Sequence, residues 1–220
     1  MSKKRRKTPA RQQPQEAPEV VYLTEFEITT EPMEDRRYKR LPKHVKEAFE
    51  RLHYLAQSQP RQAIPELLSW IERYPDIPML YNYLSMAYSA AGQYAEAEAV
   101  IRTNYQQNPD YLFARLNYAE LCLAEGDYAQ VAEIFQHKFT LTQLYPNRRR
   151  FHISEVANFM GFLGIYFFRI GQQDTARSYY ELLQEIAPDF PVVKELRRLL
   201  FPGPLRRLLM RRAGRPPADS

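Results

Sequence analysis

Apolar residues in the middle of the chain recur at the spacing of an α-helix. Leu84 and Tyr88 lie four residues apart, and Ala97 and Ile101 repeat this interval after Gly92. Residues three or four apart share one face of a helix, and glycine adopts at little cost the left-handed backbone that ends helices. The pattern therefore predicts two helices joined near Gly92, with the small side chain of Ala97 allowing them to approach closely.

The helix pair recurs along the chain with a fixed period. Gly92 and Gly126 are each followed two residues later by a tyrosine, and Pro75 and Pro109 are separated by the same interval as these glycines. Each proline stands where the second helix of a pair should stop, because proline cannot continue a helix. The period, about 34 residues, is typical of a series of similar units stacked along the chain.

An insertion interrupts this period before the last unit. The interval from Gly126 to Gly171 exceeds the interval from Gly92 to Gly126 by about 11 residues, which correspond to about three helical turns. We expect one or both flanking helices to be longer than standard, around a turn at Tyr145, Pro146 and Asn147.

A helix–turn–helix unit with this period resembles the tetratricopeptide repeat. The family pattern of Trp-x-x-Leu-Gly-x-x-Tyr, Ala-x-x-x-Phe and Pro appears here as Tyr81-x-x-Leu84-Ser85-x-x-Tyr88, Ala97-x-x-x-Ile101 and Pro109. The resemblance covers residues 43–190. It implies an all-α fold, a right-handed α-solenoid of about four repeats with a C-terminal capping helix and flexible basic tails. Within a repeat domain at 43–200, the repeats and the cap are expected at residues 44–77, 78–111, 112–145, 157–190 and 192–200.

Such repeats stack into a superhelix with a concave binding surface, and the family lines this groove mainly with the first helix of each unit. Transferring the groove positions onto the second, third and fourth units gives twelve candidates: Met79, Asn82, Tyr83, Met86, Phe113, Leu116, Asn117, Glu120, Asn158, Phe162, Ile165 and, at the rim, Arg169. The same positions also include Ser89, Leu123, Gly161 and Phe168.

The candidate groove is rich in Met, Phe, Tyr and Leu, which suits an extended or helical peptide with apolar anchors. Its three asparagines could hydrogen-bond the peptide backbone, because an amide both donates and accepts. The alternative is that many of these side chains belong to the core between helices. The main interpretation is a protein-interaction scaffold that binds a peptide or partner segment in this groove.

Some members of the family bind the C-terminal carboxylate of chaperones with a clamp of two Lys, one Arg and two Asn. Asn117 matches one clamp position here, but Phe113, Asn158 and Phe162 stand where the clamp needs cations or their neighbours. A carboxylate buried without compensation is costly. We therefore predict that this chain has no chaperone carboxylate clamp.

Residues 1–42 are interpreted as a disordered, basic and proline-rich tail with an extended segment at residues 20–30. In that segment Tyr22, Phe26 and Ile28 alternate with acidic or polar residues, a period of two that predicts extended backbone. The sequence shows no second strand. We expect the segment to lie against the helices, either in the groove or on its back.

The net charge of +5 conceals an acidic body between two basic ends. Residues 1–15 and 197–220 each carry +6, which leaves −7 for residues 16–196. Within the C-terminal tail, 201–220, a short basic helix is expected at 205–212. These ends suggest two alternative functions: an RNA- or ribosome-associated factor that binds through counterion release, or a membrane-peripheral adaptor. A further alternative is that the tails only solubilise the chain.

No residue pattern points to catalysis, a metal or a cofactor. The four histidines lack ligand spacing, and the seven glycines are scattered rather than gathered in a phosphate-binding loop. Cys122 falls at a core-facing position, where a thiol acts mostly as a small hydrophobe.

The expected compartment is the cytoplasm. A single cysteine is compatible with a reducing environment, and the N-terminus lacks the hydrophobic region of a secretory signal. The longest apolar stretch, 159–168, is about half of the ~20 residues that a membrane helix needs. We expect a non-enzymatic binding protein whose partner and oligomeric state the sequence does not identify.

Overall fold

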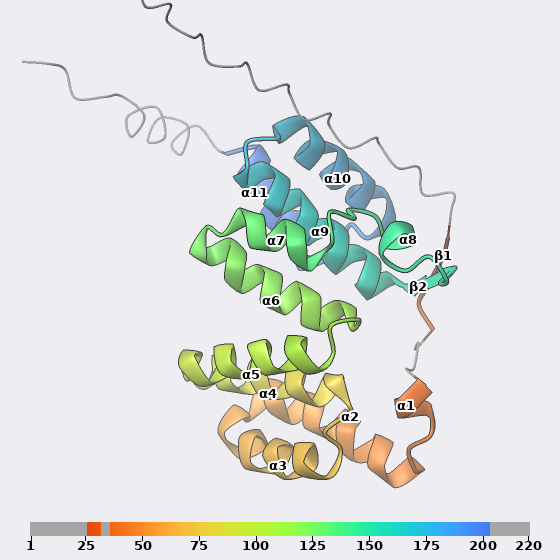
Figure 1. Ribbon diagram of the computed structural model, residues 1–220, viewed down its shortest axis with the longest axis vertical. Coiled ribbons are helices and arrows are strands. Elements are labelled where there is room, and N and C mark those ends of the chain that lie inside the picture. Colours follow the sequence, from red (N-terminus) through yellow and green to blue (C-terminus); the bar gives the residue numbers. More distant parts are fainter. Residues whose placement is uncertain (1–25, 32–35, 203–220) are drawn as a thin grey trace, which may run out of the picture.

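The computed structural model describes residues 26–31 and 36–202, and these form a stack of antiparallel helix pairs (Figure 1). The four pairs are α2 (Lys43–Ser58) with α3 (Pro60–Arg73), α4 (Pro78–Ala90) with α5 (Tyr94–Gln107), α6 (Leu112–Glu125) with α7 (Tyr128–Ile134), and α9 (Ile153–Arg169) with α10 (Gln173–Ile186). A final helix, α11 (Pro191–Leu200), ends the stack. The expected all-α solenoid is confirmed.

The turns inside the pairs follow from the sequence. Gly92, Gly126 and Gly171 all have φ values near +80°, in the left-handed region that side chains other than glycine adopt at a cost. In the first pair no glycine is needed, because Gln59 joins the two helices with φ −139° and Pro60 then begins α3. Proline suits that first helical position, where its missing N–H leaves no hydrogen bond unmade.

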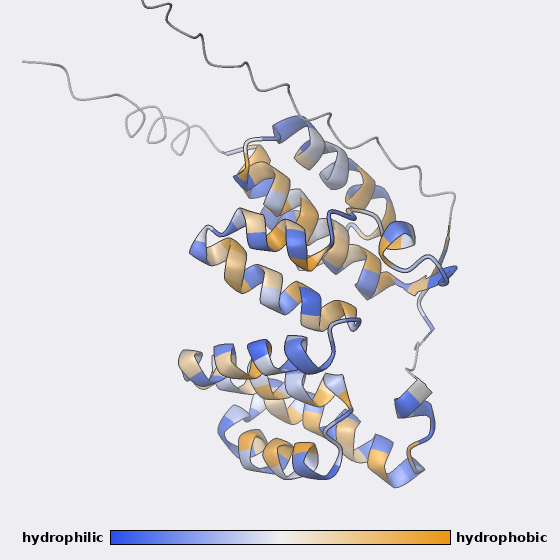
Figure 2. Cartoon of the chain, viewed as in Figure 1, coloured by the Kyte–Doolittle hydropathy of each residue, from blue (hydrophilic) through white to orange (hydrophobic). Residues whose placement is uncertain are grey.

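The buried apolar residues form two separate clusters. The N-terminal cluster extends from Tyr38 to Ala87, and the C-terminal cluster extends from Leu112 to Leu196. Hydrophobic residues lie on the faces that paired helices turn toward each other, with hydrophilic residues outside (Figure 2). The boundary between the clusters falls between α5 and α6, which we call the seam.

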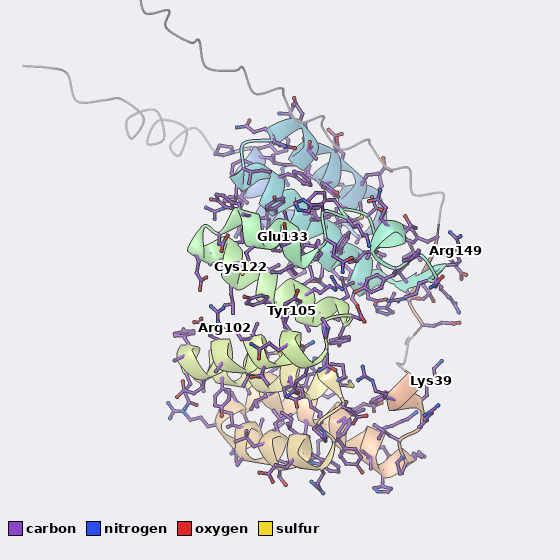
Figure 3. The ribbon with its side chains drawn as sticks, viewed as in Figure 1. Lys39, Arg102, Tyr105, Cys122, Glu133 and Arg149 are labelled. Atoms are coloured by element: carbon purple, nitrogen blue, oxygen red, sulfur yellow. The ribbon has the colours of Figure 1, made fainter. Side chains whose placement is uncertain are left out.

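Polar and aromatic side chains join the two halves at the seam. The rings of Tyr105 on α5 and Tyr118 on α6 stack with centroids 4.8 Å apart. Beside them, Arg102 bridges Glu98 of its own helix at 2.7 Å and Glu125 of α6 at 3.0 Å. Arg102 and Tyr105 lie on the side of α5 that faces α6 (Figure 3). The two halves are therefore held together at the seam by polar and aromatic stacking contacts, and the apolar packing is not continuous there.

The insertion builds structure that the sequence did not predict. It contains α8 (Leu141–Leu144) and a three-residue strand, β2 (Arg150–His152). The expectation of a longer flanking helix holds for α9, which has 17 residues, but α7 has only seven. Gln136 and His137, just beyond α7, have positive φ values, and this backbone turns the chain away from the helix axis.

A buried arginine contacts the last residue of α7. Arg115 of α6 is 4% exposed and donates a hydrogen bond of 2.6 Å from Nη1 to the main-chain oxygen of Ile134, the last residue of α7. Its Nη2 pairs with Asp110 at 3.1 Å. The guanidinium thus satisfies a carbonyl that a longer helix would have used internally.

The N-terminal segment that the structure describes also departs from expectation. Strand β1 (Glu27–Thr29) does find a partner, because it pairs in parallel with β2 in the register Glu27 to Arg150. Phe26 packs edge-to-face on Phe151 with centroids 5.1 Å apart. The segment therefore lies against the insertion, and the sequence-based expectation that no second strand exists was wrong.

The chain then continues to the other end of the stack. Helix α1 (Arg36–Lys39) lies near α2, and Tyr38 is buried against Phe49 with ring centroids 6.3 Å apart (Figure 1). Packing thus begins before residue 43, within the stretch expected to be a tail. We call residues 26–31 and 36–42 together the N-terminal strap. The expected disordered stretch 1–19, residues 20–25 of the extended segment and the basic helix at 205–212 lie outside the described residues.

Candidate functional site

The first helices of the pairs form one continuous side of the stack. Contacts run from α2 to α4, from α4 to α6, from α6 to α9 and from α9 to α11, so each first helix meets the next. Helix α11, expected only as a cap, continues this row. The side of the stack on which the sequence analysis expects the groove is therefore built from α2, α4, α6, α9 and α11.

The twelve candidate groove residues divide by exposure. Ten retain exposed surface: Met79, Asn82, Tyr83 and Met86 on α4, Phe113, Asn117 and Glu120 on α6, and Asn158, Ile165 and Arg169 on α9. Leu116 and Phe162 are each only 3% exposed and belong to the C-terminal cluster. A partner would touch little of these two side chains. The binding role of the whole set stays a prediction.

Two of the three candidate asparagines, Asn82 and Asn117, hydrogen-bond to each other within the chain. The side-chain oxygen of Asn82 accepts from the amides of Asn104 at 2.9 Å and Asn117 at 3.1 Å. Asn104 in turn accepts from Asn108 at 3.1 Å and donates to the oxygen of Pro78 at 3.2 Å. We call Asn82, Asn104, Asn108 and Asn117 the asparagine network. It joins α4, α5 and α6 across the seam, so Asn82 is engaged in holding the halves together.

The sequence reasoning missed the buried part of this network. Asn104 and Asn108 lie on the second helix of their unit and at its end, and both are buried, with Asn104 only 2% exposed. The available signal was their interval of four residues, which places both side chains on one face of the helix. The third candidate asparagine, Asn158, is exposed and donates to the main-chain oxygen of Ser154 at 2.7 Å.

The N-terminal end of the groove is aromatic and rich in sulfur. Tyr83 of α4 stacks on His53 of α2, with ring centroids 4.8 Å apart and planes 25° apart. Burial, followed by the nearby Tyr38 and Glu50, raises the pKa of the Tyr83 hydroxyl far above its usual value, so this group remains a hydrogen-bond donor. Met79 and Met86 are half-buried and pack on the same N-terminal cluster. Methionine adapts its shape to varied apolar partners.

At the C-terminal end, three helices line an open hollow with a volume of about 300 Å³, which we call the α11 pocket. Helix α6 contributes Glu120, Leu123 and Ala124, helix α9 contributes Phe162, Ile165 and Arg169, and helix α11 contributes Glu195. Four of the twelve candidates thus converge on one hollow. Glu195 was missed because α11 was treated as a cap without a groove face.

The electrostatics of the α11 pocket centre on Glu120. The surrounding protein keeps water from part of this carboxylate, and the neighbouring carboxylate of Glu195 adds repulsion; together they raise the pKa of Glu120 to about 7. The side chain remains open to solvent on the groove side, so water screens part of the repulsion. Near neutral pH the pocket therefore holds a carboxyl group that gains or loses a proton readily.

The insertion contains a basic cluster, Arg148, Arg149 and Arg150, and two of these arginines form ion pairs within the chain. Arg148 pairs with Glu155 at 2.8 Å and lies over the ring of Phe151 at 4.3 Å. Arg150 pairs with Glu27 at 3.2 Å and with Glu31 at 3.0 Å. Arg149 is exposed at the outer edge (Figure 3). These internal pairs reduce the positive charge available to a nucleic acid at this site.

Residues with catalytic potential occupy ordinary structural positions. Cys122 is buried, and burial, as the largest effect, raises the pKa of its thiol, which keeps it in the less reactive protonated form. Within residues 26–31 and 36–202, no group of three or more His, Cys, Asp or Glu side chains could hold a metal ion. Among the described helices, none combines the length and the apolar character needed to cross a bilayer.

The stacked pairs and their continuous row of first helices define an α-helical repeat protein. Two sequence models of the tetratricopeptide repeat match the chain, one at residues 52–111 and the other at residues 88–137. Residues 52–137 are therefore similar to the tetratricopeptide repeat family. No curated protein matches the chain. Repeats of this family support a general role as a protein–protein interaction scaffold, and the family is generally not enzymatic.

Proposed function

We propose that the chain is a non-enzymatic scaffold that binds a peptide or partner segment along its concave groove. The observation that carries this proposal is the α11 pocket, in which four candidate residues of α6 and α9 meet Glu195 of α11. Concave surfaces with apolar walls and a few placed polar groups are the usual form of a binding site. A segment lying there would contact α6, α9 and α11 together.

The opposite end of the groove supplies apolar anchoring surface. Met79, Tyr83 and Met86 lie half-buried along α4, on the same row of first helices. Complete burial of one exposed apolar side chain contributes about 1.5–3 kcal/mol, and these half-buried side chains gain less, so the anchors on α4 supply only part of the affinity and the remaining contacts of the groove must add to it. The proposal therefore places apolar anchors on α4 and a mixed apolar and polar contact in the α11 pocket.

Affinity capture from the native cell tests this proposal. We would compare the full chain with two groove variants, Met86→Glu and Ile165→Glu, each of which places a charge on half-buried groove surface. The matched control is Leu68→Glu, because Leu68 is a 42% exposed leucine on the second-row helix α3. Thermal unfolding followed by circular dichroism verifies that all variants fold.

The expected result is a set of proteins retained by the wild type and by Leu68→Glu but lost from both groove variants. Nuclease treatment and moderate salt should leave this set unchanged, because apolar contacts depend weakly on salt whereas nucleic-acid binding falls steeply with it. Partners that survive both groove substitutions, or that disappear with nuclease, would contradict groove binding. The second outcome would favour the RNA-associated alternative instead.

A further inference from the structure

The α11 pocket combines apolar walls with acidic groups on opposite sides. Leu123 and Ile165 supply most of the exposed apolar surface, because Phe162 is only 3% exposed, whereas Glu120 comes from α6 and Glu195 from α11. The two carboxylates are close enough for the charge of Glu195 to raise the cost of charging Glu120. A ligand that fills this hollow therefore contacts apolar side chains along its own length and the two carboxylates at one end.

Neither carboxylate is neutralised by the protein itself. Within the described part of the chain, no cation forms an ion pair with Glu120 or Glu195. Arg169 lines the same pocket but makes no such bridge to either one. Some other glutamates do have such partners: Glu98 and Glu125 pair with Arg102, and Glu155 pairs with Arg148.

We propose that the α11 pocket receives a lysine or arginine side chain of the bound segment, with its cationic head between Glu120 and Glu195 and its aliphatic stem along Leu123 and Ile165. This inference rests on the proposed groove function and adds the chemistry of one partner residue. Long cationic side chains bury their methylene groups against apolar surface while the charge remains at a polar edge. The pocket offers both surfaces together.

The size of the pocket fits this occupant. A volume of about 300 Å³ is at the lower end of small-molecule sites and holds one long side chain with some water. A hydrogen bond between a cationic donor and a carboxylate is roughly twice as strong as one between neutral groups. A cation would also relieve the repulsion between the two glutamates, which a neutral or anionic side chain would not.

Arg169 determines how deep the cation can lie. Its guanidinium is exposed at the end of α9 and carries the same charge as the proposed guest. A lysine or arginine of the partner should therefore enter from the side away from Arg169, nearer α11. Removal of Arg169 should strengthen binding of a cation, whereas removal of the glutamates should weaken it.

A direct test uses side-chain analogues on the full chain. The probes are n-butylguanidinium and n-butylammonium, which mimic arginine and lysine side chains, with n-butanol as the uncharged control. Binding is followed through the methyl NMR signals of Leu123 and Ile165. We expect both cations to bind at least fivefold more tightly than n-butanol in these titrations.

Substitutions of the charged pocket residues then test which of them attract and which repel the bound cation. Glu120→Gln with Glu195→Gln should weaken n-butylguanidinium at least fivefold and leave n-butanol unchanged, and Arg169→Ala should tighten the cation. Glu185→Gln is the matched control, since Glu185 is an exposed glutamate of α10 outside the pocket. Equal affinities for cation and alcohol, or cation binding that survives the double glutamine variant, would overturn the proposal.

The same variants separate this inference from the proposed function. If Ile165→Glu abolishes capture of partners and the double glutamine variant does not, the groove binds partners but not through a basic residue. If the analogues bind as expected while Ile165→Glu leaves capture intact, the pocket recognises cations but groove scaffolding is wrong. Loss of capture with both variants, while the Leu68→Glu and Glu185→Gln controls retain it, supports both statements.

Discussion

The asparagine network offers the sharpest test of how the two halves are joined. Asn104 is almost fully buried and takes part in three side-chain hydrogen bonds, to Pro78, Asn82 and Asn108. Replacing it with alanine removes all three bonds without adding bulk. Asn108 then keeps a buried amide without its acceptor, and the side-chain oxygen of Asn82 keeps only the bond from Asn117.

The cost can be worked from these contacts. Each hydrogen bond contributes about 0.5–1.5 kcal/mol net, and a buried polar group left without a partner costs about 1–3 kcal/mol. For Asn104→Ala we expect a loss of about 2–4 kcal/mol in the free energy of unfolding. The matched control is Gln106→Ala, because Gln106 is an exposed amide on the same helix, and we expect this change to fall within about 0.5 kcal/mol of wild type.

The assay is urea unfolding of the full chain, followed by circular dichroism and by the fluorescence of Trp70. Trp70 lies in the N-terminal half, packed on Phe49 with ring centroids 5.2 Å apart, so its signal reports that half separately. We expect the two probes to coincide in the wild type and to separate in Asn104→Ala. A loss no larger than the one expected of the exposed control, with coincident transitions, would refute the idea that this network couples the halves.

Three other substitutions or conditions test separate parts of the structure. A Cβ added at Gly161 would overlap the side chain of Val192 on α11, so Gly161→Ala should lower the melting temperature, and adding Val192→Ala should restore part of the loss, because it removes the two nearest carbons but leaves a Cβ 2.9 Å away. Phe151 is fully buried, so Phe151→Ala should lower the free energy of unfolding by about 3–5 kcal/mol. Arg150→Ala, at an exposed ion pair, should lower it by at most about 1 kcal/mol. Similar losses for the two substitutions would show that the strap is held by charge. Burial and the charge of Glu195 raise the pKa of Glu120 to about 7. Between about pH 4.5 and 7 the folded state therefore binds more protons than the unfolded state. The contribution of Glu120 to the free energy of unfolding should accordingly fall as pH rises through that window. A carboxyl NMR titration should show the raised value and its decrease in Glu195→Gln, and an ordinary value in the wild type would contradict the assignment.

The sequence predicts the fold well because its signals are local. Gly126 and Gly171 stand at backbone positions that favour glycine, and the repeat interval fixes which faces of successive helices meet. The same register places Glu120 and Ile165 on one side of the stack, and the α11 pocket brings them together. The position of each of these two residues within its repeat was sufficient to predict the side of the stack on which it lies.

The remaining features depend on contacts between distant segments. Strand β2 has only three residues, too few for an alternating pattern to appear, and its partner β1 lies in a distant part of the sequence. Arg115 is a residue type usually exposed, and its partner at Ile134 is a main-chain oxygen that no residue pattern reveals. Glu195 faces the pocket because α11 packs closely against Gly161 and Gly164. This packing between helices cannot be read from the local sequence around Glu195.

The N-terminal strap has a consequence for how the chain folds. In a simple repeat stack each unit contacts only its neighbours, so folding can begin anywhere and spread. The bond between Arg150 and Thr29 instead joins residues 121 positions apart, and closing so long a loop costs chain entropy before any contact rewards it. The pairing of β1 with β2 should therefore form last during folding and open first during unfolding. While it is formed, the N-terminal strap contacts both the first and the last helix pair, so the stack is more than a linear array of neighbours.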